Sequence, residues 1–90
     1  MNETKEERRK KTINRIHRIQ GQLAALEQSI QANKPCKDLV IQARTVEKAT
    51  ASLISHMFEG FLLHQYKDIM HTDRDQAIQE ISGLFKLINQ

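Results

Sequence analysis

Residues that interrupt helices are scarce in this sequence of 90 residues, and so are the patterns that build β-sheets. It contains one proline, three glycines and no tryptophan. No long run alternates apolar with polar side chains, which is the pattern of half-buried strands. The composition therefore predicts an all-α protein.

Cysteine and long apolar runs are equally scarce. The single Cys36 excludes an internal disulfide framework and is typical of a protein that works in a reducing cytosol. No uninterrupted apolar run approaches the roughly 20 residues that a membrane-spanning helix needs, and the charged N-terminus lacks the apolar core of a signal peptide. We therefore expect a soluble cytoplasmic protein that does not contact a membrane.

The sequence also lacks the patterns of catalysis. There is no glycine-rich phosphate loop. Glu59 follows His56, and Asp68 follows His64, at the spacing of ordinary neighbours on a helix surface. No set of nucleophile, base and orienting group can be assembled. The sequence thus predicts a protein that is not an enzyme and requires no cofactor.

Hydrophobic periodicity predicts three helices, over about 5–31, 35–68 and 73–89. Thr4 and Glu7 have the spacing of a capping box at the start of the first helix. Pro35 suits the first turn of the second helix, and Thr72 with Asp75 is a candidate cap for the third. We expect one helical domain over residues 1–90, with no second domain.

The second expected helix is apolar over much of its circumference. One of its faces carries Leu39, Ala43, Val46, Thr50, Leu53, Met57 and Phe61, in steps of three and four. Such a helix needs neighbours on two sides, and a chain of this length forms only a thin core. We therefore expect it to pack against helices of its own chain and of a second copy.

A basic row occupies one face of the first expected helix, on which residues follow one another in steps of three and four. It consists of Arg8, Lys11, Arg15, Arg18 and Gln22. Cations spaced about 5–6 Å apart on a helix suit the phosphates of double-stranded DNA, and arginine and glutamine also bind base edges. A solvated helix face explains the same pattern, and no helix-turn-helix is evident.

Cys36 lies in the first turn of the second expected helix, between Lys34 and Lys37. The helix N-terminus and the two cations favour a thiolate, which could bind a metal or attack an electrophile. The alternative is that Cys36 packs as a small apolar residue. His17, beside the basic row, is expected on the surface or facing DNA, and His56 is expected in the core. Because the sequence contains no HxxxH or CxxC pair, any metal site would have to be assembled across chains.

Three features together resemble a known family. They are the segment RIHRIQGQLAALEQSI at 15–30, a lone cysteine that opens the next long helix, and a short amphipathic last helix. They resemble the small helical repressors typified by CsoR, RcnR and FrmR, over nearly the whole chain.

This resemblance implies a homodimer built as an antiparallel four-helix bundle, and two dimers that form a homotetramer. It implies that basic faces bind operator DNA until an effector lowers the affinity. It also implies that Arg15, Arg18 and Gln22 face DNA and that Cys36 is the sensing cysteine.

Two positions depart from the metal sensors of that family. Its copper sensors have a histidine at the position of Phe61 and a second cysteine at the position of Gln65, and its nickel and cobalt sensors have histidine at both. Phenylalanine has no ligating atom, and an amide is a poor ligand for a soft metal. The persulfide sensors need a second cysteine, which this chain lacks.

By elimination, the first expectation is a small electrophile such as formaldehyde that reacts at Cys36. Formaldehyde sensors of the family cross-link this cysteine to the N-terminal amine of a partner chain. They typically begin with proline after the initiator methionine is removed, whereas the residue after Met1 is Asn2 here. The second expectation is a transition-metal effector, nickel, cobalt or zinc rather than copper, bound by Cys36 and His64. The remaining alternatives are a DNA binder whose sensing site has decayed and a structural helical oligomer with a basic tail.

Overall fold

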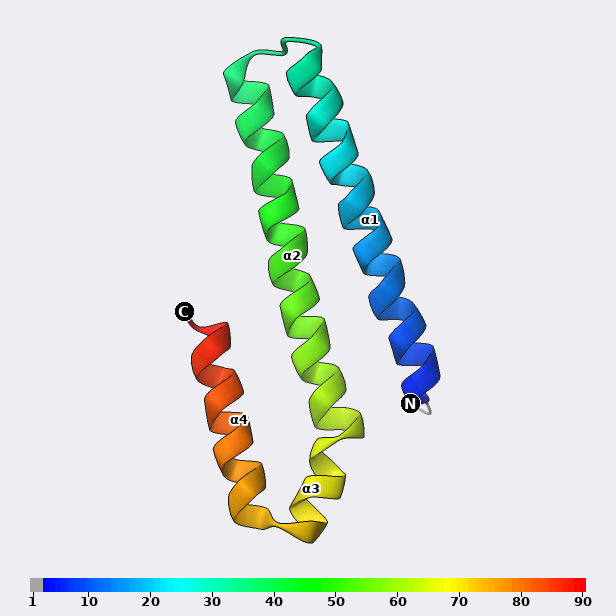
Figure 1. The fold of residues 1–90 in the computed structure, drawn as a ribbon, viewed down its shortest axis with the longest axis vertical. Coiled ribbons are helices and arrows are strands. Elements are labelled where there is room, and N and C mark those ends of the chain that lie inside the picture. Colours follow the sequence, from blue (N-terminus) through cyan, green and yellow to red (C-terminus); the bar gives the residue numbers. More distant parts are fainter. Residues whose placement is uncertain (1–2) are drawn as a thin grey trace.

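The computed structural model describes residues 3–90, apart from the side chains of Lys67 and Ile69. In this range the chain forms α1 (Lys5–Gln31), α2 (Cys36–His64), α3 (Tyr66–Thr72) and α4 (Arg74–Ile88). The long helices α1 and α2 pack antiparallel, and α4 folds back beside the C-terminal half of α2 (Figure 1). The prediction of an all-α fold is confirmed.

The first helix begins at a side-chain cap. The Thr4 hydroxyl accepts a hydrogen bond from the Glu7 backbone N–H at 3.0 Å and donates one to the Glu7 carboxylate at 3.3 Å. Beyond Gln31, Asn33 has a φ of 57°, a left-handed conformation that asparagine tolerates. The carbonyl of Pro35 then accepts hydrogen bonds from the first turn of α2. This tight connection sets α2 alongside α1.

The second helix is shorter than predicted. It ends at His64 rather than at 68, and Gln65 separates it from α3. The backbone at Gln65 keeps a helical ψ of −40°, but its φ of −118° lies outside the range of a regular α-helix. Gln65 offsets α3 from α2, and the chain then reverses at Asp73, between α3 and α4, so that α4 packs beside α2 (Figure 1). Because neither proline nor glycine occurs next to Gln65, no local signal in the sequence marked the end of α2.

The predicted cap of the last helix was wrong as well. Thr72 is the final residue of α3, and the N-cap of α4 is Asp73. The Asp73 carboxylate accepts a hydrogen bond from the Gln76 N–H at 3.1 Å. A carboxylate also suits a helix N-terminus electrostatically, because the helix dipole is positive there.

The helices of one chain leave many large apolar side chains exposed. Ile30 is 54% exposed, Val40 53% and Phe85 60%. Apolar surface of this extent usually marks an interaction site. It is consistent with packing against a second copy, and the dimer and tetramer remain predictions. None of the described helices is both long enough and apolar enough to cross a membrane.

Candidate functional site

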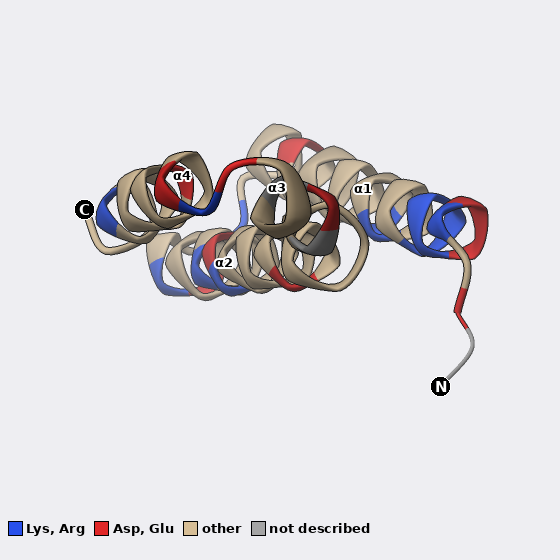
Figure 2. Ribbon diagram, turned by 90° about the horizontal axis from the view of Figure 1, so that it is seen from below, with Lys and Arg blue, Asp and Glu red and all other residues tan. Residues whose placement is uncertain are grey.

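The basic row lies along the N-terminal half of α1, where Figure 2 shows lysine and arginine gathered together with several acidic residues. Lys11 and Arg18 are exposed, and Arg15 and Gln22 are half-buried. Arg15 Nη1 donates a hydrogen bond to Ser52 Oγ of α2 at 3.0 Å. The row therefore borders α2 along one side.

A shallow hollow opens where this row meets α2. It is lined by Arg15, Arg18, Ile19, Gln22, Ala49 and Ser52. Ala49 and Ser52 are small, so they leave the arginine side chains accessible from outside. Gln22 Oε1 has no hydrogen-bond partner in the described part of the chain. The hollow thus presents two cations that can bind phosphates and base edges, whereas Gln22 Oε1 is itself buried.

Arg8 occupies a different environment from the rest of the row. Its side chain is only 12% exposed. Nη2 donates to the His56 carbonyl at 2.8 Å and lies 3.0 Å from His56 Nδ1, while Nη1 lies 3.4 Å from Glu59 Oε1. Gly60 makes room for this side chain, because a Cβ there would lie 3.3 Å from Arg8 Nε. Arg8 therefore ties α1 to α2.

His56 is the centre of this polar contact between the helices. It is 7% exposed, and its Nε2 lies 2.9 Å from Thr12 Oγ1. The Thr12 hydroxyl donates to the Arg8 carbonyl, so it accepts from His56 Nε2–H. Nδ1 is then free to accept from Arg8, which makes the imidazole neutral. The prediction that His56 is a satisfied core histidine agrees with this geometry.

The buried imidazole makes stability depend on pH. Burial, with the charges of Arg8 and Arg15 in addition, lowers the pKa of His56 below its ordinary value of 6.5. The unfolded chain then binds more protons than the folded chain just below pH 6.5, so the free energy of unfolding falls as the pH falls through this range. We expect urea midpoints to decrease from pH 7.5 to pH 5.5, and to decrease less in His56→Gln. An equal decrease in both proteins would contradict this prediction.

Cys36 is the first residue of α2, and its thiol is exposed and free. Pro35 immediately precedes it and starts the helix at this point. The structure therefore places the thiol where it is accessible to a metal ion or an electrophile.

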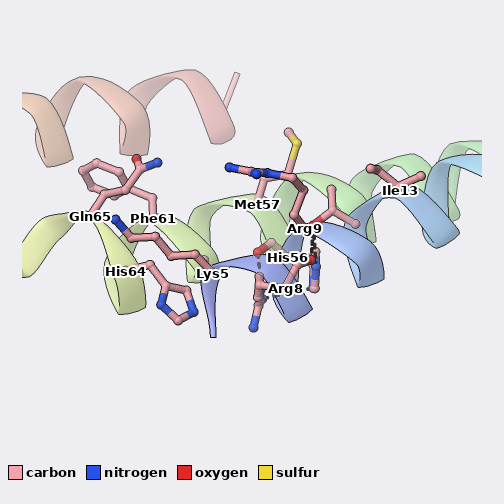
Figure 3. A pocket seen from close by; sticks show the side chains of 11 residues that line it. Lys5, Arg8, Arg9, Ile13, His56, Met57, Phe61, His64 and Gln65 are labelled. Carbon is pink, nitrogen blue, oxygen red and sulfur yellow. Dashed lines mark hydrogen bonds between the residues drawn. The ribbon is translucent and has the colours of Figure 1, made fainter. Parts of the chain in front are cut away.

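His64, the second candidate ligand, lies at the opposite end of α2. Because α2 has 29 residues and each adds about 1.5 Å, Cys36 and His64 of one chain lie about 40 Å apart. Figure 3 shows His64 pointing away from Phe61 and Gln65, which point toward α4. No group of three or more His, Cys, Asp or Glu residues within the described ranges could hold a metal ion. One chain therefore does not form the predicted site alone.

Glu3 is a residue that the sequence reasoning missed. One carboxylate oxygen lies 2.7 Å from Lys11 Nζ, and the other lies 3.3 Å from Arg8 Nη1 and 3.6 Å from His64 Nε2. The hydrogen bond from Lys11, together with that from Arg8 and the nearby imidazole of His64, lowers the pKa of Glu3 to about 2, although desolvation acts in the opposite direction. Because Glu3 precedes the helix, periodicity provided no signal for it. The predicted role of the N-terminal amine at Met1 and of Asn2 lies outside the described residues.

Comparison with known proteins adds evidence of another kind. Residues 8–88 match the family described as metal-sensitive transcriptional repressors. The copper-sensing transcriptional repressor CsoR of Bacillus subtilis (strain 168) is 30% identical to this chain over 74 residues, which are 81% of this chain and 73% of that protein. No solved structure matches the chain.

Proposed function

The chain belongs to the family of metal-sensitive transcriptional repressors, which are not enzymes, and we propose that it binds operator DNA through α1 until an effector binds at Cys36. The family match, which covers nearly the whole chain, carries this proposal. The hollow with two arginines and the accessible thiol support it from the structure.

We assign the DNA contacts to Lys11, Arg15, Arg18 and Gln22. Their side chains follow one face of α1, on which Lys11 and Arg18 are exposed and Arg15 and Gln22 are half-buried at the hollow beside α2. Arg8 was expected in the same row. Since its guanidinium is engaged by His56, Glu59 and Glu3, we assign Arg8 to holding the two helices together.

The family match favours a metal ion as the effector. The sequence, interpreted by elimination, had instead favoured a small electrophile. In an antiparallel dimer, Cys36 of one chain could meet His64 of the second copy, which a single chain does not permit. Thiolate and imidazole together suit nickel, cobalt or zinc. The donor set of the family's copper sensors cannot form here, because Phe61 has no ligating atom and Gln65 replaces a thiolate.

A small electrophile is the second candidate, and it is favoured by the isolation of the thiol from other donors in its own chain. In this chemistry the Cys36 sulfur and an amine of the second copy each form a bond to the carbon of formaldehyde, and one molecule of water is released. The product is an S–CH2–N bridge between chains.

Either effector would act by the same physical route. A bond between the start of α2 and the second copy would shift the packing of the bundle and thereby move the DNA-contacting row. A coupling free energy of about 1–3 kcal/mol changes affinity by roughly 5–150-fold. That range is sufficient to switch a promoter.

We expect Cys36→Ser to leave DNA binding unchanged and to abolish the response to effector, because the exposed thiol makes no contact that the fold requires. Fluorescence anisotropy of a labelled duplex from upstream of the gene measures binding, with Ni(II), Co(II), Zn(II), Cu(I) and formaldehyde added separately. Loss of DNA binding together with the response would instead indicate a structural cysteine.

A second variant distinguishes the two effectors. His64→Ala should abolish a metal response and leave a formaldehyde response intact, whereas His71→Ala, an exposed histidine of α3, should leave both intact. A duplex bound no better than a random sequence would refute the repressor proposal.

A further inference from the structure

The Glu3 carboxylate lies between the N-terminal part of α1 and the C-terminal end of α2. Its Oε2 forms a 2.7 Å ion pair with Lys11 Nζ. Its Oε1 lies 3.3 Å from Arg8 Nη1 and 3.6 Å from His64 Nε2. The Glu3 side chain is 18% exposed. A residue outside every helix is thus bound by two residues of α1 and lies against one residue of α2.

Lys11 is the partner of Glu3 that the solvent reaches most easily, with a side chain that is 61% exposed. It is also one of the cations assigned to DNA. An ammonium group that already binds a carboxylate attracts a phosphate less, because the two anions compete for the same donors and repel each other. Glu3 therefore opposes the contact that Lys11 would make with DNA.

The position of Glu3 is enforced by the packing around Arg8. Arg8 is 12% exposed, and its Nη2 donates to the His56 carbonyl, so Arg8 cannot move toward a phosphate. Because Arg8 also binds Glu3, it keeps the Glu3 carboxylate in place. By contrast, Glu6 and Arg9 form an ion pair in which both side chains are about two-thirds exposed. Solvent-exposed pairs of that kind are weak and separate easily. We therefore expect Glu3 to stay beside Lys11 when DNA approaches.

We propose that Glu3 is an intramolecular competitor of the DNA phosphate at Lys11 and sets the affinity for DNA below the level that the basic row alone would give. This inference rests on the proposed function in one respect, namely that Lys11 faces DNA. It goes beyond that function because it assigns an inhibitory role to Glu3, which does not belong to the DNA-contacting row.

The test is Glu3→Gln, which keeps the shape of the side chain and removes its charge. We expect DNA to bind about fivefold more tightly near 0.15 M salt, and the plot of log affinity against log salt to steepen by about 0.9 for each additional phosphate contact. Glu6→Gln is the matched control. It removes the same charge three residues further along the chain, from an ion pair with Arg9 that does not involve Lys11. Circular dichroism checks that the helix content is unchanged.

Lys11→Ala identifies the partner. In that background Glu3→Gln should no longer steepen the salt dependence, because the competing cation is absent. If Glu3→Gln and Glu6→Gln change affinity and slope equally, or if the effect of Glu3→Gln persists without Lys11, the inference is overturned while the repressor proposal stands.

The DNA-binding titrations also separate the two proposals if the repressor proposal is the one that fails. Phosphate contacts govern binding to a random duplex as well as to an operator. If the protein shows no preference for its own promoter, the repressor proposal fails, and the salt dependence on the random duplex still decides whether Glu3 competes at Lys11.

Discussion

Replacing Arg15 and Arg18 together by alanine is expected to weaken operator binding by roughly 30-fold or more, because each arginine contributes about 1–3 kcal/mol to such an interface. The salt dependence should also flatten, by about 0.9 for each phosphate that the variant no longer binds. The fold should persist, since Arg18 is exposed and Arg15 makes its hydrogen bond to Ser52 at the surface. Anisotropy titrations at several salt concentrations measure both quantities.

The control for this pair removes the same charge elsewhere. Arg9 and Arg44 are 67% and 68% exposed, and each forms an ion pair with a glutamate three residues away. Replacing both by alanine should change operator affinity much less than replacing Arg15 and Arg18. Equal decreases in affinity in the two double variants would mean that DNA responds only to net charge, and that the hollow between α1 and α2 is not the interface.

Replacing Arg8 by alanine is expected to have the largest effect on stability, a decrease of about 2–3 kcal/mol in the free energy of unfolding. Hydrogen bonds to charged groups contribute about 1.5–3 kcal/mol, and unsatisfied partners add a penalty. The variant leaves the buried His56 Nδ1 and the His56 carbonyl without the Arg8 donor. Urea unfolding at one fixed protein concentration measures the change, because stability in an oligomer depends on concentration.

Arg9 provides the neighbouring control, since its side chain is exposed and bound only by Glu6 in the described structure. Arg9→Ala should change stability by less than about 0.5 kcal/mol. Arg8→Lys should restore only part of the stability, because an ammonium cannot reproduce the planar arrangement of guanidinium donors. An Arg8→Ala protein that is fully stable but binds DNA poorly would return Arg8 to the DNA-contacting row.

Features that depend on neighbouring residues could be predicted from the sequence. The helix over 5–31 follows from its apolar period, and α1 has these bounds. Thr4 caps it because a hydroxyl at that place reaches the N–H three residues later. Pro35 places Cys36 in the first turn of α2 for an equally local reason. The capping, the helix and the position of the thiol required no knowledge of the other helices.

The end of α2 could not be predicted in the same way. The apolar pattern runs on past His64, and neither proline nor glycine interrupts it. The interruption at Gln65 precedes α3, and the chain reverses only after α3, so that α4 contacts α2 from a distant part of the sequence. Asp73 rather than Thr72 caps α4, because α3 extends through Thr72.

By itself, the sequence determined the helical class, the basic face of α1 and the single cysteine at the start of α2, since each follows from composition, from the period of a helix or from the position of Pro35. Only the tertiary structure decided which cations of that face remain accessible. Arg8 and Arg15 belong to one row by spacing, yet α2 covers Arg8 and leaves Arg15 at the border of the hollow. Periodicity assigns residues to a face of a helix, but the packing of a second helix determines how much of that face meets solvent.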